Sequence, residues 1–212
     1  AYEYNLNEAM VLCDEAKTAL QSYIAGMKLP KTVVRTVTGV PDVSGESFIA
    51  DTVSSDGKSE KRPVFYVGYG HWENDDMEDY RAMGVNLIQY EIGPEHILKK
   101  ASDEEIAAGK LFTVDTEKLK EVREVFERAE DCGVSIVFLT AMHYFPEFLY
   151  EYDPTIINGG KVSDFPNFTP YNPTHPVVLD TFNQFLDAII PVIKDYKSLN
   201  SICISNEPVF TA

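Results

Sequence analysis

The sequence is poor in basic residues. It has 18 lysines and arginines against 34 aspartates and glutamates, which gives a formal net charge of −16. A surface of that sign repels phosphate backbones and anionic lipid, so we expect neither a nucleic acid nor a membrane as a partner. The charge is compatible with a neutral ligand such as a sugar, although solubility alone also explains it.

Cysteine is scarce as well. Cys13, Cys132 and Cys203 are far apart and form no C-x-x-C pair, so neither a zinc cluster nor a disulfide framework is indicated. We predict three buried free thiols. No apolar run reaches the ~18 residues of a membrane-spanning helix. The first residue is Ala1 rather than Met, which leaves a removed signal peptide open and slightly favours a secreted or periplasmic location.

Residues 1–62 are expected to form an entry segment ahead of the main fold. Apolar residues recur at helical spacing over 7–27, which predicts a helix that begins at Asn7 and stops before Pro30. Residues 31–62 are rich in β-branched residues and then polar, which predicts one or two strands and an exposed connection.

From Pro63 onward the sequence alternates between strand and helix patterns. Continuous apolar runs predict buried strands at 63–70, 85–92, 134–141 and 201–204, and periodic segments predict helices at 75–83, 116–131 and 176–197. Gly84 and Gly133 fit left-handed helix caps ahead of two of the strands. The alternation predicts an α/β fold with a parallel sheet, either a small open sheet or the first half of a barrel, since 212 residues is short of the ~250 of a complete eightfold barrel.

Polar and aromatic residues follow all four predicted strands, where ligands bind in parallel α/β folds. Taken singly, each histidine or the lone tryptophan is more often structural than functional. Asn206-Glu207 is harder to dismiss, because a carboxylate next to a core strand has a raised pKa, as a general acid needs. The strand-end candidates are His71, Trp72, Glu91, His143, Tyr144, Asn206 and Glu207.

The ending I-S-N-E-P resembles the fourth strand of the clan A glycoside hydrolases, which are retaining enzymes on a (β/α)8 barrel. The stretch M-E-D-Y-R-A-M-G-V-N-L-I-Q looks like the first helix and second strand of that clan. The stretch from I-V-F-L-T-A-M-H-Y-F-P to Y-D-P is similar to the third strand and loop of family 42 β-galactosidase-like enzymes. The resemblance covers roughly residues 63–210 and leaves out 1–62.

The resemblance implies hydrolysis of β-linked sugars by double displacement, with no cofactor and no metal. Glu207 would be the general acid/base, and Asn206 would contact the sugar 2-hydroxyl. His143, Tyr144, His71, Trp72 and Glu91 would line the glycone subsite. The nucleophile of this clan follows the seventh strand, so we expect residues 63–212 to be the first four βα units of a barrel whose carboxyl-terminal half is a partner of this segment.

Two other functions fit the same residues. A non-catalytic sugar-binding or scaffold domain would bind carbohydrate without turnover. Alternatively, His71, Glu91, His143 and Glu207 would converge on a divalent cation, as in metal-dependent barrel enzymes, although no paired-ligand motif supports this.

Overall fold

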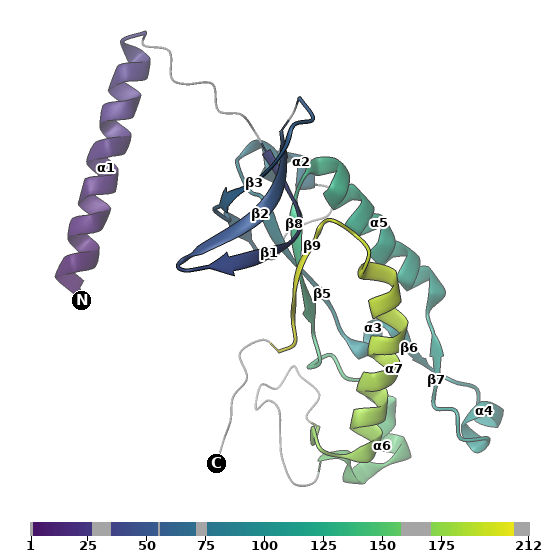
Figure 1. Cartoon of the computed structure of the whole chain (residues 1–212). Helices are drawn as coiled ribbons and strands as arrows, with labels where there is room; N and C mark the ends of the chain where they lie inside the picture. The colour runs from purple at the N-terminus through teal and green to yellow at the C-terminus, as the bar shows by residue number, and fades with distance from the viewer. Residues whose placement is uncertain (1, 27–34, 55, 71–75, 158–170, 206–212) are drawn as a thin grey trace. The chain divides into compact units, whose positions relative to one another are not determined.

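The structure is a computed structural model of the 212-residue chain, and it describes residues 2–26, 35–54, 56–70, 76–157 and 171–205 (Figure 1). The chain divides into two compact units, Ala1–Val34 and Arg35–Ala212. The second unit contains the parallel sheet together with residues 35–62. The boundary between the compact units is thus not at residue 62, and the division into an entry segment and βα units stays a prediction.

In the first unit, the described residues 2–26 form the helix α1 (Tyr2–Ile24) and the turn that follows it. The predicted helix is confirmed, but it begins before Asn7, since no proline or glycine interrupts the preceding residues. From Met10 onward, nearly all described side chains of α1 are exposed, including Met10, Leu20 and Ile24.

The second unit opens with a three-stranded antiparallel sheet: β1 (Arg35–Ser44), β2 (Ser47–Ser54) and β3 (Ser59–Val64). The expected one or two strands are thus three. In β2, residues alternate between exposed and buried, and Ala50, Thr52 and Ser54 face inward. β1 runs past the start of the parallel sheet, where the Gly39 N–H donates to the Lys197 carbonyl over 2.6 Å.

The parallel sheet has four strands in the order β4 (Gly68–Tyr69), β5 (Leu87–Ile92), β8 (Ser135–Thr140) and β9 (Leu199–Cys203). All three strand pairs are parallel. The connecting helices are α2 (Met77–Ala82), α5 (Thr116–Cys132) and α7 (Pro176–Ile193). The predicted βα alternation and parallel sheet are confirmed.

The helices cover one face of this sheet. Tyr69 stacks on Tyr80, which follows the start of α2, and Phe138 of β8 packs against Phe126 of α5. Figure 1 shows α5 and α7 together on that side. By length and composition alone α7 is apolar enough to cross a membrane, but Val178, Phe185 and Ile189 are fully buried in the protein core.

The prediction of a long buried strand at residues 63–70 is wrong. Residues 63–64 belong to β3, only two residues form β4, and Phe65 is 83% exposed. Among the described strands, β4 is an edge strand whose one hydrogen-bonded neighbour is β5, so its apolar run lacks the cover that a central strand receives. Residues 71–75, which directly follow this predicted strand, lie outside the described residues.

The fourth predicted strand is less buried than expected, because β9 is the opposite edge of the sheet. Ile202 and Ile204 are exposed, and the strand ends at Cys203. The thiols are free, as predicted, but they are not buried: Cys13 is exposed, and Cys132 and Cys203 are partly exposed. Cys203 is partly exposed for the same reason as Ile202, since it lies on an edge.

An excursion between β5 and α5 has no counterpart in the predictions from sequence. It consists of α3 (Pro94–Ile97), β6 (Leu98–Lys100), α4 (Asp103–Ala107) and β7 (Phe112–Val114). The short elements α6 (Phe148–Tyr152) and η2 (Pro154–Ile157) follow β8. Segments of three to five residues are too short to show periodicity, and α4 is instead fixed by a capping box of Ser102 and Glu105.

Candidate functional site

The carboxyl ends of β5 and β8 meet at one point of the sheet. Glu91 pairs in register with Leu139, and the Ala141 N–H donates to the Ile92 carbonyl over 3.1 Å. The segment that leaves β8 therefore lies against the end of β5. This brings two of the predicted candidates, Glu91 and His143, into contact.

His143 and Glu91 form the central pair of the site. His143 Nε2 lies 3.0 Å from Glu91 Oε1, and their side chains are only 14% and 27% exposed. A carboxylate accepts hydrogen bonds and cannot donate one, so the imidazole carries its proton on Nε2 in this contact. The pair is partly shielded from water, which strengthens it compared with an exposed ion pair.

Tyr144 completes this group. Its ring lies 4.4 Å from that of His143 and 5.0 Å from that of His96, both measured between centroids. Burial raises the pKa of the Tyr144 hydroxyl, and the nearby Glu91 carboxylate, to which the hydroxyl hydrogen-bonds, raises it further. We call Glu91, His143 and Tyr144 the strand-end cluster.

The turn after β5 holds the strand-end cluster in place. The Gly93 N–H donates to His96 Nδ1 over 2.9 Å, and the Glu95 N–H donates to the Tyr144 carbonyl over 3.0 Å. Burial lowers the pKa of His96, so its imidazole favours the neutral form that accepts this bond. Sequence reasoning missed His96 and Gly93, although Gly-Pro directly after a strand signals a structured turn.

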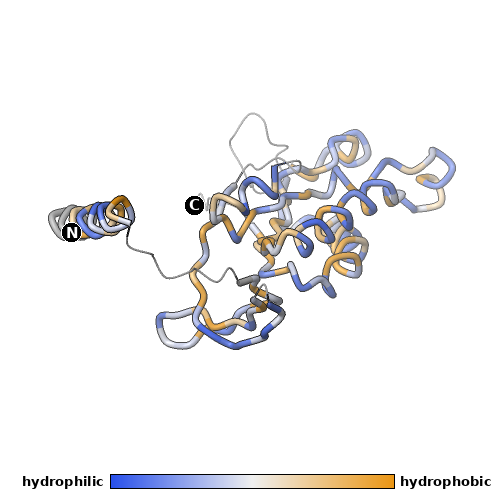
Figure 2. Tube along the Cα trace, turned by 90° about the horizontal axis from the view of Figure 1, so that it is seen from above, coloured by the Kyte–Doolittle hydropathy of each residue, from blue (hydrophilic) through white to orange (hydrophobic). Residues whose placement is uncertain are grey.

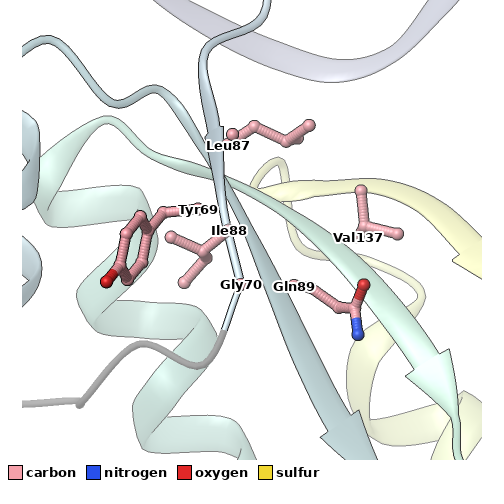
Figure 3. Close-up of a pocket in the computed structure, with 7 residues that line it drawn as sticks. Tyr69, Gly70, Leu87, Ile88, Gln89 and Val137 are labelled. Atoms are coloured by element: carbon pink, nitrogen blue, oxygen red, sulfur yellow. The ribbon is translucent and has the colours of Figure 1, made fainter.

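Glu91 belongs to the face of the sheet that the helices leave uncovered. Along β5, Ile88 and Ile92 are buried, whereas Leu87, Gln89 and Glu91 alternate with them and are partly exposed. A pocket of about 220 Å³ is lined by Gly68, Tyr69, Gly70 and Ile88 and by three further side chains, those of Leu87, Gln89 and Val137. Figure 3 shows these three side chains pointing away from Tyr69 and Ile88. The pocket lies at the β4–β5 edge of the sheet, and none of its lining residues belongs to the strand-end cluster.

The other candidates cannot be placed. His71, Trp72, Asn206 and Glu207 lie outside the described residues. The last described residues before Asn206 are fixed to β8, because the Thr140 hydroxyl contacts the carbonyls of Cys203 and Ile204 at 3.2 and 3.0 Å. β9 is thus attached to the strand that carries His143 at its end.

A second histidine cluster is structural. His175 Nδ1 accepts the Val177 N–H and caps α7, so the proton of a neutral ring is on Nε2. His175 Nε2 lies 3.1 Å from Thr155 Oγ1, and the Thr155 hydroxyl donates to Asp153 over 2.6 Å. The imidazole cannot take a proton from Thr155 in this arrangement, so the cluster joins η2 to α7 without activating a nucleophile.

No group of three or more metal-ligating side chains occurs within residues 35–54, 56–70, 76–157 and 171–205. Two of the four residues considered for a divalent cation, His71 and Glu207, lie outside those ranges. The strand-end cluster offers a carboxylate that hydrogen-bonds to both an imidazole and a phenol, and all three groups can form hydrogen bonds with hydroxyl groups of a ligand.

No family model and no curated protein matches this sequence. Among solved structures, the chain is similar to the X-ray structure of a chitobiase from Flavobacterium johnsoniae, with a TM-score of 0.43 and 14% identity. The match covers 80% of this chain and 27% of that chain, so this chain spans about a quarter of its length. A likeness at this level is too low to assign a fold or a function.

Proposed function

We propose that this chain is the amino-terminal part of a retaining glycoside hydrolase of clan A, which acts on β-linked sugars. One observation carries the proposal: the strand-end cluster lies at the carboxyl ends of β5 and β8, with Glu91 on the face of the sheet opposite α5 and α7. That is the position of ligand sites in barrels of parallel strands. Its three side chains suit the recognition of sugar hydroxyls.

Two residues beyond β9 would perform the chemistry. Glu207 would protonate the glycosidic oxygen as the bond to the anomeric carbon breaks, while a second carboxylate attacks that carbon. Glu207 would then take a proton from water, whose oxygen displaces the enzyme carboxylate and frees the sugar. Asn206 would bind the 2-hydroxyl. The second carboxylate would come from a strand beyond the four described.

The strand-end cluster would bind the glycone. The Glu91 carboxylate would accept from sugar hydroxyls, and His143 would be held in orientation by Glu91. Tyr144 and Trp72 would supply aromatic surface for the sugar ring, with His71 beside them. The charge of −16 on the chain suits such a neutral ligand.

Exposed apolar residues at both edges of the sheet support a longer barrel. Phe65 and Val67 are exposed beside β4, and Ile202 and Ile204 are exposed at β9. Open edges of this kind favour pairing with further strands. Added βα units would cover Leu87 and Val137 on the bare face and would bring the nucleophile to the site.

The test is hydrolysis of aryl β-glycosides by the natural-length polypeptide that contains these residues. A panel of galactoside, glucoside, mannoside and xyloside would be compared between the wild type, Glu207→Gln and the exposed control Glu124→Gln. We expect Glu207→Gln to lower kcat by ~10²–10⁴-fold for poor leaving groups and much less for activated ones. Retention of the anomeric configuration would be followed by NMR.

Turnover that Glu207→Gln does not change would overturn the assignment of the acid/base. Sugar binding without turnover in the natural-length protein would favour the non-catalytic carbohydrate-binding domain, because the strand-end cluster suits binding by itself. Stoichiometric metal in the purified protein, with activity lost on chelation, would favour the metal-dependent enzyme.

A further inference from the structure

The pairing of β8 with β9 is interrupted by one extra residue. Ile136 pairs with Leu199. The next residue of β8, Val137, pairs with Ser201 rather than with Asn200. Asn200 is therefore an additional residue on β9, and the two strands form a β-bulge at this point. Bulges bend a strand and redirect the side chains that follow, and they are frequent beside active sites.

The bulge allows two apolar side chains of β9 to face the helices. Ile202 pairs with Phe138, which packs against Phe126 of α5. Leu199 pairs with Ile136, which lies two residues before Phe138 and so on the same face. Figure 2 shows hydrophobic and hydrophilic residues mixed along the helices of the second unit, as helices with one buried side require. Residues three positions apart point to opposite faces of a regular strand, so Leu199 and Ile202 share a face only because of the extra residue.

The same bulge turns the alternate residues of β9 to the face that carries Glu91. Cys203 pairs with Leu139, whose partner on β5 is Glu91. Ser201 pairs with Val137, which lies two residues before Leu139. We call these five residues the Glu91 face. In a regular strand of the same sequence, every residue after position 200 would point to the opposite side of the sheet.

Contacts before and after the bulge keep the extra residue at position 200. Before it, the N–H groups of Lys197 and Ser198 both donate to the Glu130 carboxylate. After it, the Thr140 hydroxyl contacts the carbonyls of Cys203 and of the residue that follows. The chain is thus fixed on both sides, and the one residue in excess is accommodated between them.

The Asn200 side chain anchors the bulge. Asn200 is only 6% exposed, and its Nδ2 donates to the Tyr66 hydroxyl over 2.7 Å. Tyr66 lies between β3 and β4, and its ring packs edge-on against Phe48 of β2 with 5.8 Å between the ring centroids. A buried amide needs such a partner, whereas a β-branched residue at this position would favour a regular strand.

We infer that Asn200 is a positioning residue of the proposed hydrolase, because the bulge that it forms turns the Glu207 carboxylate to the Glu91 face. Glu207 lies outside the described residues, four positions after Cys203. Residues of an extended chain that are an even number of positions apart point to the same side, so Glu207 follows the direction of Cys203. The inference rests on the proposed function, in which Glu207 is the general acid/base.

Two changes at position 200 separate the direction of the β9 side chains from the mere presence of a bulge. Asn200→Val keeps the number of residues but removes the amide, so we expect the strand to become regular and Glu207 to turn away from the Glu91 face. Deletion of Asn200 also removes the bulge, but it leaves Val137 opposite Ser201, so every later residue keeps its side. The deletion is therefore the matched control, although it is the larger change.

Hydrolysis of aryl β-glycosides with poor and with activated leaving groups would be measured in the natural-length protein. A misplaced general acid slows the departure of poor leaving groups and matters little for activated ones, whereas a loss of folded protein lowers both rates equally. We expect Asn200→Val to lower kcat/KM for poor leaving groups by ~10²-fold relative to activated ones, since misplacement on the order of 1 Å has that effect. The deletion should keep the wild-type ratio of the two rates.

Methyl NMR would report the register of β9 independently of activity. The Ile202 methyl groups should show Overhauser contacts to the Phe138 ring in the wild type and in the deletion. In Asn200→Val, these contacts should move to the Leu139 methyl groups, because a regular strand places Ile202 opposite Leu139.

A register that Asn200→Val does not shift, or an unchanged ratio of rates when the register does shift, would overturn the inference. A deletion that lowers the ratio as much as Asn200→Val would overturn it too. A wild-type protein without turnover would overturn the proposed function and with it the role of Asn200. Turnover that depends on Glu207 but not on the register would overturn the inference alone.

Discussion

Gly93 lies so close to Tyr144 that a β-carbon added to Gly93 would come within 2.6 Å of the Tyr144 β-carbon and would also meet the Ala141 carbonyl oxygen. The turn after β5 and the segment after β8 cross at this point without room for a methyl group. The position of the strand-end cluster therefore depends on a glycine that contributes no chemistry.

We predict that Gly93→Ala destabilises the protein by about 1–3 kcal/mol, because backbone rather than a flexible side chain must move to accept the methyl group. Urea unfolding would measure the change. Gly70→Ala is the matched control, since nothing lies within 4 Å of a β-carbon there and we expect a change of under ~0.5 kcal/mol. Equal effects at the two glycines would show that the crossing is not tight.

We predict that Glu91→Ala costs about 1–3 kcal/mol, because it leaves the partly buried Nε2 proton of His143 without its acceptor. ¹⁵N NMR of the imidazole would report the tautomer directly. Nε2 should be protonated in the wild type, and this preference should weaken in the variant. Glu124→Ala, on the exposed side of α5, should change neither the tautomer nor the stability beyond ~0.5 kcal/mol. A wild-type ring protonated on Nδ1 would contradict the pairing.

We predict that the neutral His96 side chain makes stability depend on pH. Burial has the largest effect and lowers the pKa of His96 in the folded protein. The nearby Glu95 carboxylate raises this pKa, and Lys118 and Lys99 lower it. Between its ordinary value of 6.5 and the lower folded value, the unfolded chain binds more protons. This contribution to stability is therefore complete above pH 6.5 and is lost as the pH falls toward the folded pKa.

His96→Asn tests this prediction, because the amide oxygen can still accept the Gly93 N–H but does not titrate. Unfolding free energies would be measured from pH 7.5 to 5 for both proteins. The decline below pH 6.5 should be shallower in the variant. Parallel curves would assign the acid sensitivity to other groups.

Much of the second unit follows from the sequence. The periodic apolar faces of 116–131 and 176–197 correspond to α5 and α7, and the glycines at 84 and 133 adopt the positive φ angles that left-handed caps require. The juxtaposition of Glu91 and His143 also follows, since parallel strands that neighbour each other bring their carboxyl ends together.

Each feature that the sequence analysis predicted wrongly or missed has a physical explanation. The run from Pro63 to Gly70 has the composition of a central strand, but hydropathy does not reveal whether a strand has two neighbours. The same is true of Ile202 at the other edge. His96 was missed because its role depends on a backbone N–H three residues earlier, which a side-chain pattern does not show.

Thr140 provides the last test, because it connects the end of β8 to the segment that leads toward Glu207. Its side chain is buried, and its hydroxyl contacts the carbonyls of Cys203 and Ile204. Thr140→Val keeps the shape but removes the donor, so we expect a loss of about 1 kcal/mol and faster amide exchange along β9. Thr38→Val is the matched control, since its hydroxyl also donates to a backbone carbonyl but is exposed.

The effect of Thr140→Val on activity distinguishes a structural role from a functional one. Under the proposed function, a displaced β9 moves Glu207 from the glycosidic oxygen, and misplacement on the order of 1 Å can cost ~10²-fold in rate. We therefore expect kcat for aryl glycosides to fall by more than the change in stability explains at temperatures where the variant is fully folded. Unchanged kcat with faster exchange in β9 would mean that the segment carrying Glu207 is positioned by contacts other than this hydroxyl.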